Sequence, residues 1–242
     1  MSRRIEESYT EFPPIEEAFR AALDESLRPR SPELLYEIVA GLGLPEASLV
    51  VDVGCGDGRH SHRLAERFGF SVVGIDPFPP DVDEERVHFL RGAAEALPVE
   101  DGTAELVWCR DVVVHVADLD RAYAEFHRVL RDGGHALVYQ TFATDRLEPR
   151  EAEWLWRALG VVAASADPAR AEAAVAASAL RVEERIDLGS EWASGRRSSR
   201  ARLAGSCCTL PACYETRSGT VRGSARRPTK SCSATASGTC TR

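Results

Sequence analysis

Residues 48–78, SLVVDVGCGDGRHSHRLAERFGFSVVGIDPF, limit the possible folds of this chain more than any other stretch. Residues 49–53 form a short, β-branched apolar run, which predicts a strand buried in a parallel sheet. Alternating glycines follow, so the backbone there bends sharply and approaches a ligand with no Cβ in the way. Residues 59–68 predict a helix, and residues 71–75 a second strand that ends on Asp76. This order predicts an α/β fold with a Rossmann-like, doubly wound and mostly parallel sheet.

The glycine spacing and Asp76 together indicate a ligand that contains a nucleoside. An acid at the carboxyl end of the second strand is placed to accept hydrogen bonds from both hydroxyls of a ribose. The unpaired N–H groups of the first helical turn point toward the glycine turn. A dinucleotide fingerprint reads G-x-G-x-x-G, whereas here the third glycine comes one residue early and Arg59 takes its place. A nicotinamide-dependent oxidoreductase, which would need glycine at 59, stays open as an alternative.

The pattern Asp52-x-Gly54-x-Gly56-x-Gly58, followed by Asp76, resembles the cofactor motif of class I S-adenosylmethionine-dependent methyltransferases. The resemblance covers about residues 49–142 and is of the small-molecule type, similar to the methyltransferases of quinone biosynthesis. It implies S-adenosylmethionine as cofactor and a small-molecule acceptor. The cofactor-binding residues that it implies are Asp52, Gly54, Cys55, Gly56, Gly58, Asp76, Ala94, Glu95 and Cys109.

The stretch after the third predicted strand, residues 87–90, departs from the family pattern. Ala93 stands where the family commonly has aspartate, so the side-chain bond to the adenine amino group is expected to be absent. The N–H of Ala94 remains available, and adenine is then held mainly by shape and backbone. Cys109 ends the fourth predicted strand beside the glycine turn, and we expect a small wall residue there rather than a nucleophile.

His115, just past the fourth strand, is the best-placed titratable group for a general base, with Asp111 nearby. The position of His115 resembles one that packs between helix and sheet in the family, so a structural role is expected to outweigh catalysis. His60 and His62 lie in the first turns of the predicted helix and are expected to face solvent. The sequence shows no metal-ligand cluster, nucleophilic triad or phosphate-binding lysine.

The remaining elements follow from periodicity. A helix with a buried face from Leu119 to Leu130 is predicted to end at Gly133 and Gly134, before a fifth strand at 136–139. Helices are also predicted at 148–159 and 168–179, and a sixth strand is predicted at 181–188. Residues 1–45 predict helices, and the family resemblance implies that they cover the substrate side of the cofactor. Their aromatic residues, which pack in a core more often than they line a pocket, are Tyr9, Phe12 and Phe19.

The formal charge of −8 argues against non-specific nucleic-acid binding, which needs a basic face. No apolar run approaches the length of a membrane span, so no membrane partner is expected. The first residues carry two arginines but no apolar segment after them, unlike a secretory signal. A cytoplasmic enzyme is therefore expected, with S-adenosylmethionine binding assigned to residues 46–192.

The composition changes beyond Trp192. Residues 193–242 contain five cysteines, few acids and few large aliphatic side chains, and they have no histidine or repeated C-x-x-C pair to suggest zinc. Before this point arginine is present and lysine is absent, as a GC-rich gene produces, and such a gene read in another frame yields a tail of this composition. We therefore hypothesise that the tail is translated out of frame. On this hypothesis the tail is disordered and the family's seventh strand is missing, and a non-catalytic, cofactor-binding remnant is a second alternative.

Overall fold

The computed structural model describes residues 32–143, 148–188 and 207–216. Within these ranges, seven strands form one sheet in the order β3-β2-β1-β4-β5-β7-β6. The strands are β1 (Leu49–Val53), β2 (Ser71–Asp76), β3 (Val87–Arg91), β4 (Ala104–Arg110), β5 (Leu130–Ala143), β6 (Leu180–Arg185) and β7 (Cys207–Thr216). The first five in chain order run parallel, and β7 is antiparallel to both of its neighbours. The strand order reverses between β1 and β4, where ligands of doubly wound sheets bind.

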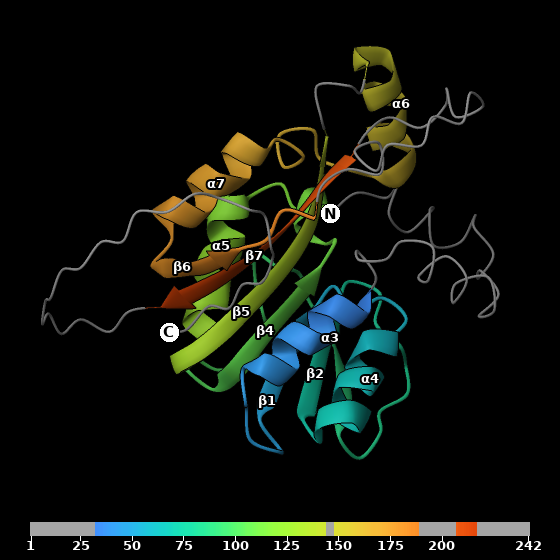
Figure 1. Cartoon of the computed structure of the whole chain (residues 1–242). Helices are drawn as coiled ribbons and strands as arrows, with labels where there is room; N and C mark the ends of the chain where they lie inside the picture. The colour runs from blue at the N-terminus through green and yellow to red at the C-terminus, as the bar shows by residue number, and fades with distance from the viewer. Residues whose placement is uncertain (1–31, 144–147, 189–206, 217–242) are drawn as a thin grey trace, which may run out of the picture.

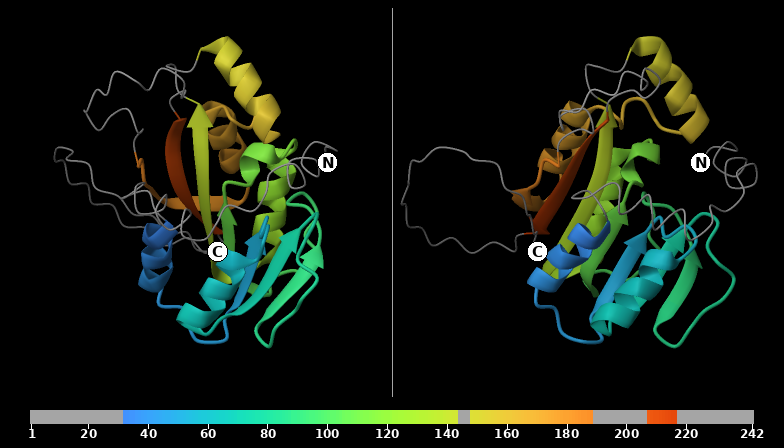
Figure 2. Two further views of the ribbon diagram at one scale, coloured as in Figure 1. Left: turned by 90° about the vertical axis from the view of Figure 1, so that its right-hand side faces the viewer. Right: turned by 45° about the vertical axis from the view of Figure 1, so that its right-hand side comes forward.

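Helices cover both faces of the sheet. They are α3 (Pro32–Gly41), α4 (Arg59–Phe68), α5 (Leu119–Val129), α6 (Pro149–Leu159) and α7 (Pro168–Ala177), with a 3₁₀ turn η1 (Val113–His115). α3 and α4 lie on one face and α5 and α7 on the other, while α6 stands beyond the carboxyl ends of β4 and β5 (Figures 1 and 2). Aspartate side chains cap two of them: Asp118 accepts from the Arg121 N–H at 3.1 Å, and Asp167 from the Ala169 N–H at 2.9 Å.

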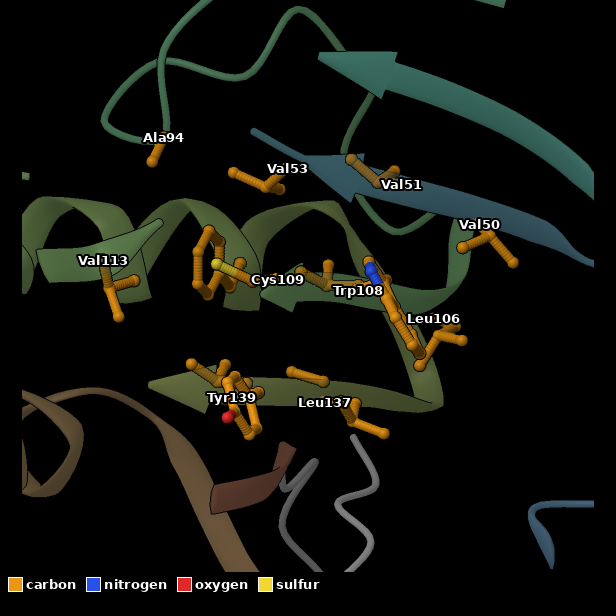
Figure 3. Packing of buried hydrophobic residues seen from close by; sticks show 14 of the residues in the cluster. Val50, Val51, Val53, Ala94, Leu106, Trp108, Cys109, Val113, Leu137 and Tyr139 are labelled. Atoms are coloured by element: carbon orange, nitrogen blue, oxygen red, sulfur yellow. The ribbon is translucent and has the colours of Figure 1, made fainter. Parts of the chain in front are cut away.

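The core lies on both faces of the central strands. Figure 3 shows part of it, with Val50, Val51 and Val53 of β1 beside Leu106 and Trp108 of β4. These five side chains are all buried, as a strand covered on both faces requires. Among the helices of the described residues, none is long and apolar enough to cross a membrane.

Most of the predicted elements are confirmed, with two boundary differences around β5. The helix ends at Val129 and not at the glycine pair, and the strand begins at once, at Leu130. Gly133 and Gly134 lie within β5, where the register with β4 shifts. A Cβ at Gly134 would meet the Ala104 carbonyl oxygen at 2.9 Å, so the glycine permits close approach of two strands rather than ending a helix.

The prediction that the sheet lacks a seventh strand is wrong. Cys207–Thr216 forms β7, which pairs with β5 from His135 to Ala143 and with β6 on its other side. Ala136–Tyr139 is therefore buried rather than an exposed edge. The backbone of this tail segment forms a ladder although its composition is poor in large aliphatic residues, because β5 and β6 offer it two open edges.

Pro211 marks β7 as an unusual central strand. It stands opposite Tyr139 of β5, and a proline has no N–H to donate to the ladder. Three predicted features lie outside the described residues: any helix within residues 1–31, the aromatic residues Tyr9, Phe12 and Phe19, and the tail other than 207–216. The out-of-frame origin of the tail stays a hypothesis.

Candidate functional site

The glycine turn after β1 has the backbone geometry that its sequence predicts. Gly54, Gly56 and Gly58 have φ angles of 72°, 55° and 77°, in the left-handed region where side chains are costly. A Cβ at Gly54 would lie 2.2 Å from a methyl carbon of Val112, and one at Gly58 would lie 2.4 Å from the Phe89 ring. The glycines at these two positions are thus required by packing as well as by backbone conformation.

Asp76, at the carboxyl end of β2, is 5% exposed and fastens the turn to its own loop. One carboxylate oxygen accepts the Gly56 N–H at 3.1 Å, and the other accepts the Phe78 N–H at 2.9 Å. Each oxygen keeps a lone pair beyond these bonds. The carboxylate is therefore held in one orientation and still has acceptor capacity toward the neighbouring cavity.

A cavity of about 680 Å³ opens at the carboxyl ends of the strands, within the usual size range of cofactor and small-molecule sites. It brings together six of the predicted site residues, which are Gly54, Asp76, Ala94, Glu95, Asp111 and His115, and Ala93 also lines it. Sequence reasoning missed its other lining residues. They include Ile75, Pro77, Gly92, Arg110, Val112, Val116, Ala117, Leu159, Gly160 and Val162.

Five predicted residues do not line this cavity: Asp52, Cys55, Gly56, Gly58 and Cys109. Burial raises the pKa of both the Cys55 and the Cys109 thiols, which fits the expectation that Cys109 is not a nucleophile. Cys109 is fully buried in β4, so it forms part of the layer beneath the site. A ligand contact by any of these five residues stays a prediction.

Asp52 is also buried, and its carboxylate faces helix α4 rather than the cavity. The Ser61 hydroxyl donates to it at 2.6 Å. Burial raises the pKa of Asp52 to about 7; the Ser61 hydrogen bond opposes the shift, and the negative charges of Asp76 and Asp57 add to it. Asp52 thus fixes the start of α4 against β1, beneath the glycine turn.

Asp111 and His115 both line the cavity and are each held by a hydrogen bond. Asp111 has a positive φ of 56°, and its side chain accepts the Thr141 hydroxyl at 3.0 Å. Burial raises the pKa of Asp111, while Arg110 and Thr141 oppose the shift. The Nδ1 atom of His115 lies 3.2 Å from the Gly160 carbonyl oxygen. Because a carbonyl only accepts, Nδ1 carries a proton, and in the neutral form of the ring the lone pair is on Nε2.

The prediction that His60 faces solvent is wrong, because its ring is half-buried and hydrogen-bonded within the protein. Its Nδ1 atom lies 2.5 Å from the Tyr36 hydroxyl and its Nε2 atom 3.3 Å from Nη1 of Arg110. Tyr36 is fully buried and stacks on Trp108, with ring centroids 5.2 Å apart. Burial, with Arg110 next, lowers the pKa of His60 to about 3, so its ring is neutral. No signal in the sequence links these residues, because they come from α3, α4 and β4.

The chemistry of the lining changes along the sheet. The end near β2 and β3 offers acceptors at Asp76 and Glu95, and among the described residues no acceptor takes the Ala94 N–H. The end near β1 and β4 offers the backbone of Gly54 and the Arg110 guanidinium. Such a lining suits a ligand with a planar base, vicinal hydroxyls and an anionic end. Within the described residues, no group of three metal-binding side chains comes together.

Comparison with protein families gives a match for residues 51–138, which fit the family described as a methyltransferase domain. The sterol 24-C-methyltransferase of Schizosaccharomyces pombe is 30% identical over 116 residues, covering 43% of this chain and 30% of that protein. The 2-methyl-6-phytyl-1,4-hydroquinone methyltransferase of a Synechocystis species is 35% identical over 106 residues, covering 39% and 32%. The aligned part spans only about a third of the length of these two relatives.

Solved structures share the fold. Geranyl diphosphate C-methyltransferase from Streptomyces coelicolor, in complex with geranyl diphosphate and S-adenosyl-L-homocysteine, has a TM-score of 0.61 at 16% identity. The likeness covers 76% of this chain and 77% of that chain. A second geranyl diphosphate methyltransferase, in complex with SAM, has a TM-score of 0.62 at 19% identity and covers 84% and 92%. The matched family residues 51–138 run from β1 to β5, the part of the sheet that surrounds the cavity.

Proposed function

We propose that this chain, which carries a class I methyltransferase domain at residues 51–138, transfers a methyl group from S-adenosylmethionine to a small-molecule acceptor. One observation carries the proposal: Asp76, oriented by two backbone N–H groups, lines a cofactor-sized cavity beside a glycine turn that tolerates no side chain at Gly54. The relatives act on different small molecules, so the acceptor class is taken from the fold and the cavity alone.

The residues present fit this cofactor. The two oxygens of Asp76 have acceptor capacity for the two ribose hydroxyls. The Ala94 N–H suits an adenine ring nitrogen, and the absence of an aspartate at Ala93 leaves the adenine amino group without a side-chain acceptor there. The Gly54 backbone lines the cavity on the side of β1, where the amino-acid part would lie.

When bound, the cofactor supplies a methyl group on a sulfonium, which a nucleophile of the acceptor attacks in line. The chain contributes alignment and a water-poor cavity, since much of the lining is apolar. Val116, Leu159 and Val162 supply that apolar wall near Asp111 and His115.

His115 has the geometry of a proton acceptor for acceptors that must lose a proton. Its Nδ1–H is bound to the Gly160 carbonyl, so the lone pair on Nε2 is available. The sequence favoured a purely structural role, whereas lining the cavity with a fixed tautomer supports a catalytic one. Asp111 stands close enough for the charges of the two groups to interact.

Calorimetry with S-adenosylmethionine, S-adenosylhomocysteine and NAD⁺ tests the proposal. We expect both adenosyl ligands to bind and NAD⁺ not to bind. Asp76→Ala removes charge-assisted hydrogen bonds of about 1.5 to 3 kcal/mol, so affinity for the adenosyl ligands falls at least about tenfold. Asp81→Ala, in the exposed loop after β2, is the matched control.

Asp76→Asn keeps one acceptor oxygen and guards against misfolding of the alanine variant. NAD⁺ binding with no adenosyl ligand bound would favour the oxidoreductase instead. Binding without methyl transfer to any acceptor in a broad screen would favour the non-catalytic remnant.

A further inference from the structure

Arg110 stands out among the described residues that line the cavity, because it is the one arginine or lysine among several acids. Within the described part of the chain, no carboxylate forms an ion pair with its guanidinium. Its Nε atom is buried and has no hydrogen-bond partner there. A buried guanidinium donor without a partner is costly, so its place in the wall of a cavity points to an anionic ligand group.

The hydrogen-bond partner that Arg110 has among the described residues is neutral. Nη1 donates to Nε2 of His60 at 3.3 Å, and because arginine only donates, Nε2 must hold the lone pair. The proton of the neutral His60 ring is then on Nδ1, which bonds the Tyr36 hydroxyl at 2.5 Å. A neutral acceptor orients the guanidinium and leaves its positive charge uncompensated. A carboxylate would orient the guanidinium and also neutralise its charge.

The order of the strands says which part of the ligand meets Arg110. Ala94 follows β3 and Asp76 ends β2, while Gly54 follows β1 and Arg110 ends β4. The sheet order β3-β2-β1-β4 therefore arranges base, ribose and amino-acid positions in sequence across the cavity, with Arg110 at the last.

We propose that Arg110 binds the α-carboxylate of the methionine part of the cofactor, with His60 and Tyr36 as positioning residues that aim its guanidinium. This assignment rests on the proposed function. The same chemistry would suit a carboxylate on the acceptor, and the order of positions along the sheet favours the cofactor.

Calorimetry with two ligands tests the assignment without any turnover. S-adenosylhomocysteine carries the carboxylate, and its decarboxylated analogue, 5′-deoxy-5′-(3-aminopropylthio)adenosine, lacks only that group. Arg110→Gln should weaken S-adenosylhomocysteine binding by about tenfold to a hundredfold and change binding of the analogue less than about threefold. Arg86→Gln is the matched charge control, since Arg86 precedes β3 at the opposite end of the sheet and donates to the Gly69 carbonyl.

The positioning roles of His60 and Tyr36 are tested with the same two ligands. His60→Leu removes the acceptor of Arg110, so it should weaken S-adenosylhomocysteine binding by about threefold to tenfold while sparing the analogue. His60→Gln returns an acceptor and should recover most of that loss. Tyr36→Phe keeps the ring stacked on Trp108 and should have a smaller effect in the same direction.

Equal loss of both ligands in Arg110→Gln, or no loss of either, would overturn the assignment while leaving the proposed function intact. Failure of the unaltered chain to bind S-adenosylhomocysteine would overturn both. Should the glutamine variant unfold, Arg110→Lys, which keeps the charge but not the fork, must still lose more affinity for S-adenosylhomocysteine than for the analogue.

Discussion

The two halves of the sheet are built from different kinds of contact. In the half formed by β1 to β4, strands pair in parallel and part of the site is built from residues close in sequence, as where the Gly56 N–H donates to Asp76, 20 residues later. In the half formed by β5, β7 and β6, pairing is antiparallel with β7, and β5 at 130–143 meets a strand at 207–216. The first half carries most of the residues of the candidate site, and the second half completes the sheet.

The two halves of the sheet therefore have different roles: the first forms the candidate ligand site, and the second completes the sheet. The glycine turn is set by short-range geometry and would hold its shape wherever β1, β2 and α4 pack together. β7 contributes backbone pairing between two strands, and its cost is the ordering of a distant segment. Damage to the second half should therefore act on stability first, and damage to the first half on ligand binding.

The largest effect is expected on removing β7. A chain ending at Ser206 exposes the β5 edge along Ala136–Tyr139, so we expect it to aggregate and to lose a cooperative melting transition. A chain ending at Thr216 keeps β7 and is the control, with a melting temperature close to that of the full chain. Light scattering and thermal denaturation measure both. If the chain ending at Ser206 is as stable and as soluble as the control, β7 is not needed to protect the edge of β5.

A second large effect is expected at Gly54. Gly54→Ala places a Cβ 2.2 Å from Val112 at a φ of +72°, so stability should fall by about 2 kcal/mol or more and S-adenosylhomocysteine binding should weaken. Gly41→Ala is the control, because a Cβ there meets nothing within 4 Å. Denaturant titration and calorimetry give the two quantities. If Gly54→Ala has the same stability and ligand affinity as Gly41→Ala, the turn accommodates a side chain at position 54 and the packing argument is wrong.

His115 lies at the border of the two halves, since Gly160, its partner, belongs to the connection between β5 and β6. His115→Asn should lower turnover about a hundredfold while leaving S-adenosylhomocysteine affinity within about threefold. The rate of S-adenosylhomocysteine release at saturating acceptor measures it, with His88→Asn, at an exposed position of β3, as control. A stability loss with near-normal turnover would return His115 to a packing role.

The smallest effect is expected from Asp52. Its pKa is raised to about 7 in the folded chain, against an ordinary value near 4 in the unfolded chain. Between these values the unfolded chain is ionised while the folded chain keeps the proton, so raising the pH through this window lowers the free energy of unfolding.

Asp52→Asn removes this dependence. It should therefore gain stability relative to the unaltered chain as the pH rises from about 4 to 7, because the unaltered chain loses stability over that window. Melting temperatures over that range test the trend, with Asp81→Asn as the exposed control. A constant difference at all pH values would mean that Asp52 is ionised in the folded chain. Unchanged ligand affinity would assign Asp52 to support of α4 rather than to the cofactor.

The parallel half could be predicted because its signals are local. A β-branched run, spaced glycines and a strand-terminal acid each act over a few residues, and Asp76 and Gly54 both line the cavity. Gly133 and Gly134 were misread, since glycine is typical both of helix ends and of close strand contacts. Only the approach of β4, seen in the packing at Gly134, decides between them.

The antiparallel half and the Arg110 network could not be predicted for another reason. Composition argued against order in the tail, whereas the backbone ladder of β7 depends on the open edges of β5 and β6. His60 looked solvated at a helix start, yet Tyr36, 24 residues earlier, and Arg110, 50 residues later, enclose it. Contacts between residues so far apart in the chain produce no periodic pattern in the sequence, so they could not be predicted from it.

The double anchoring of Asp76 has a consequence for discrimination among nucleotides. Its negative charge is fixed in place by the Gly56 and Phe78 N–H groups, so it cannot swing aside for an incoming group. On the proposed function, a ribose with two free hydroxyls would donate to it, whereas a ribose carrying a 2′- or 3′-phosphate would bring like charge against a buried carboxylate. On the proposed function, the cavity would favour adenosine compounds with free ribose hydroxyls over those that carry a phosphate on the ribose.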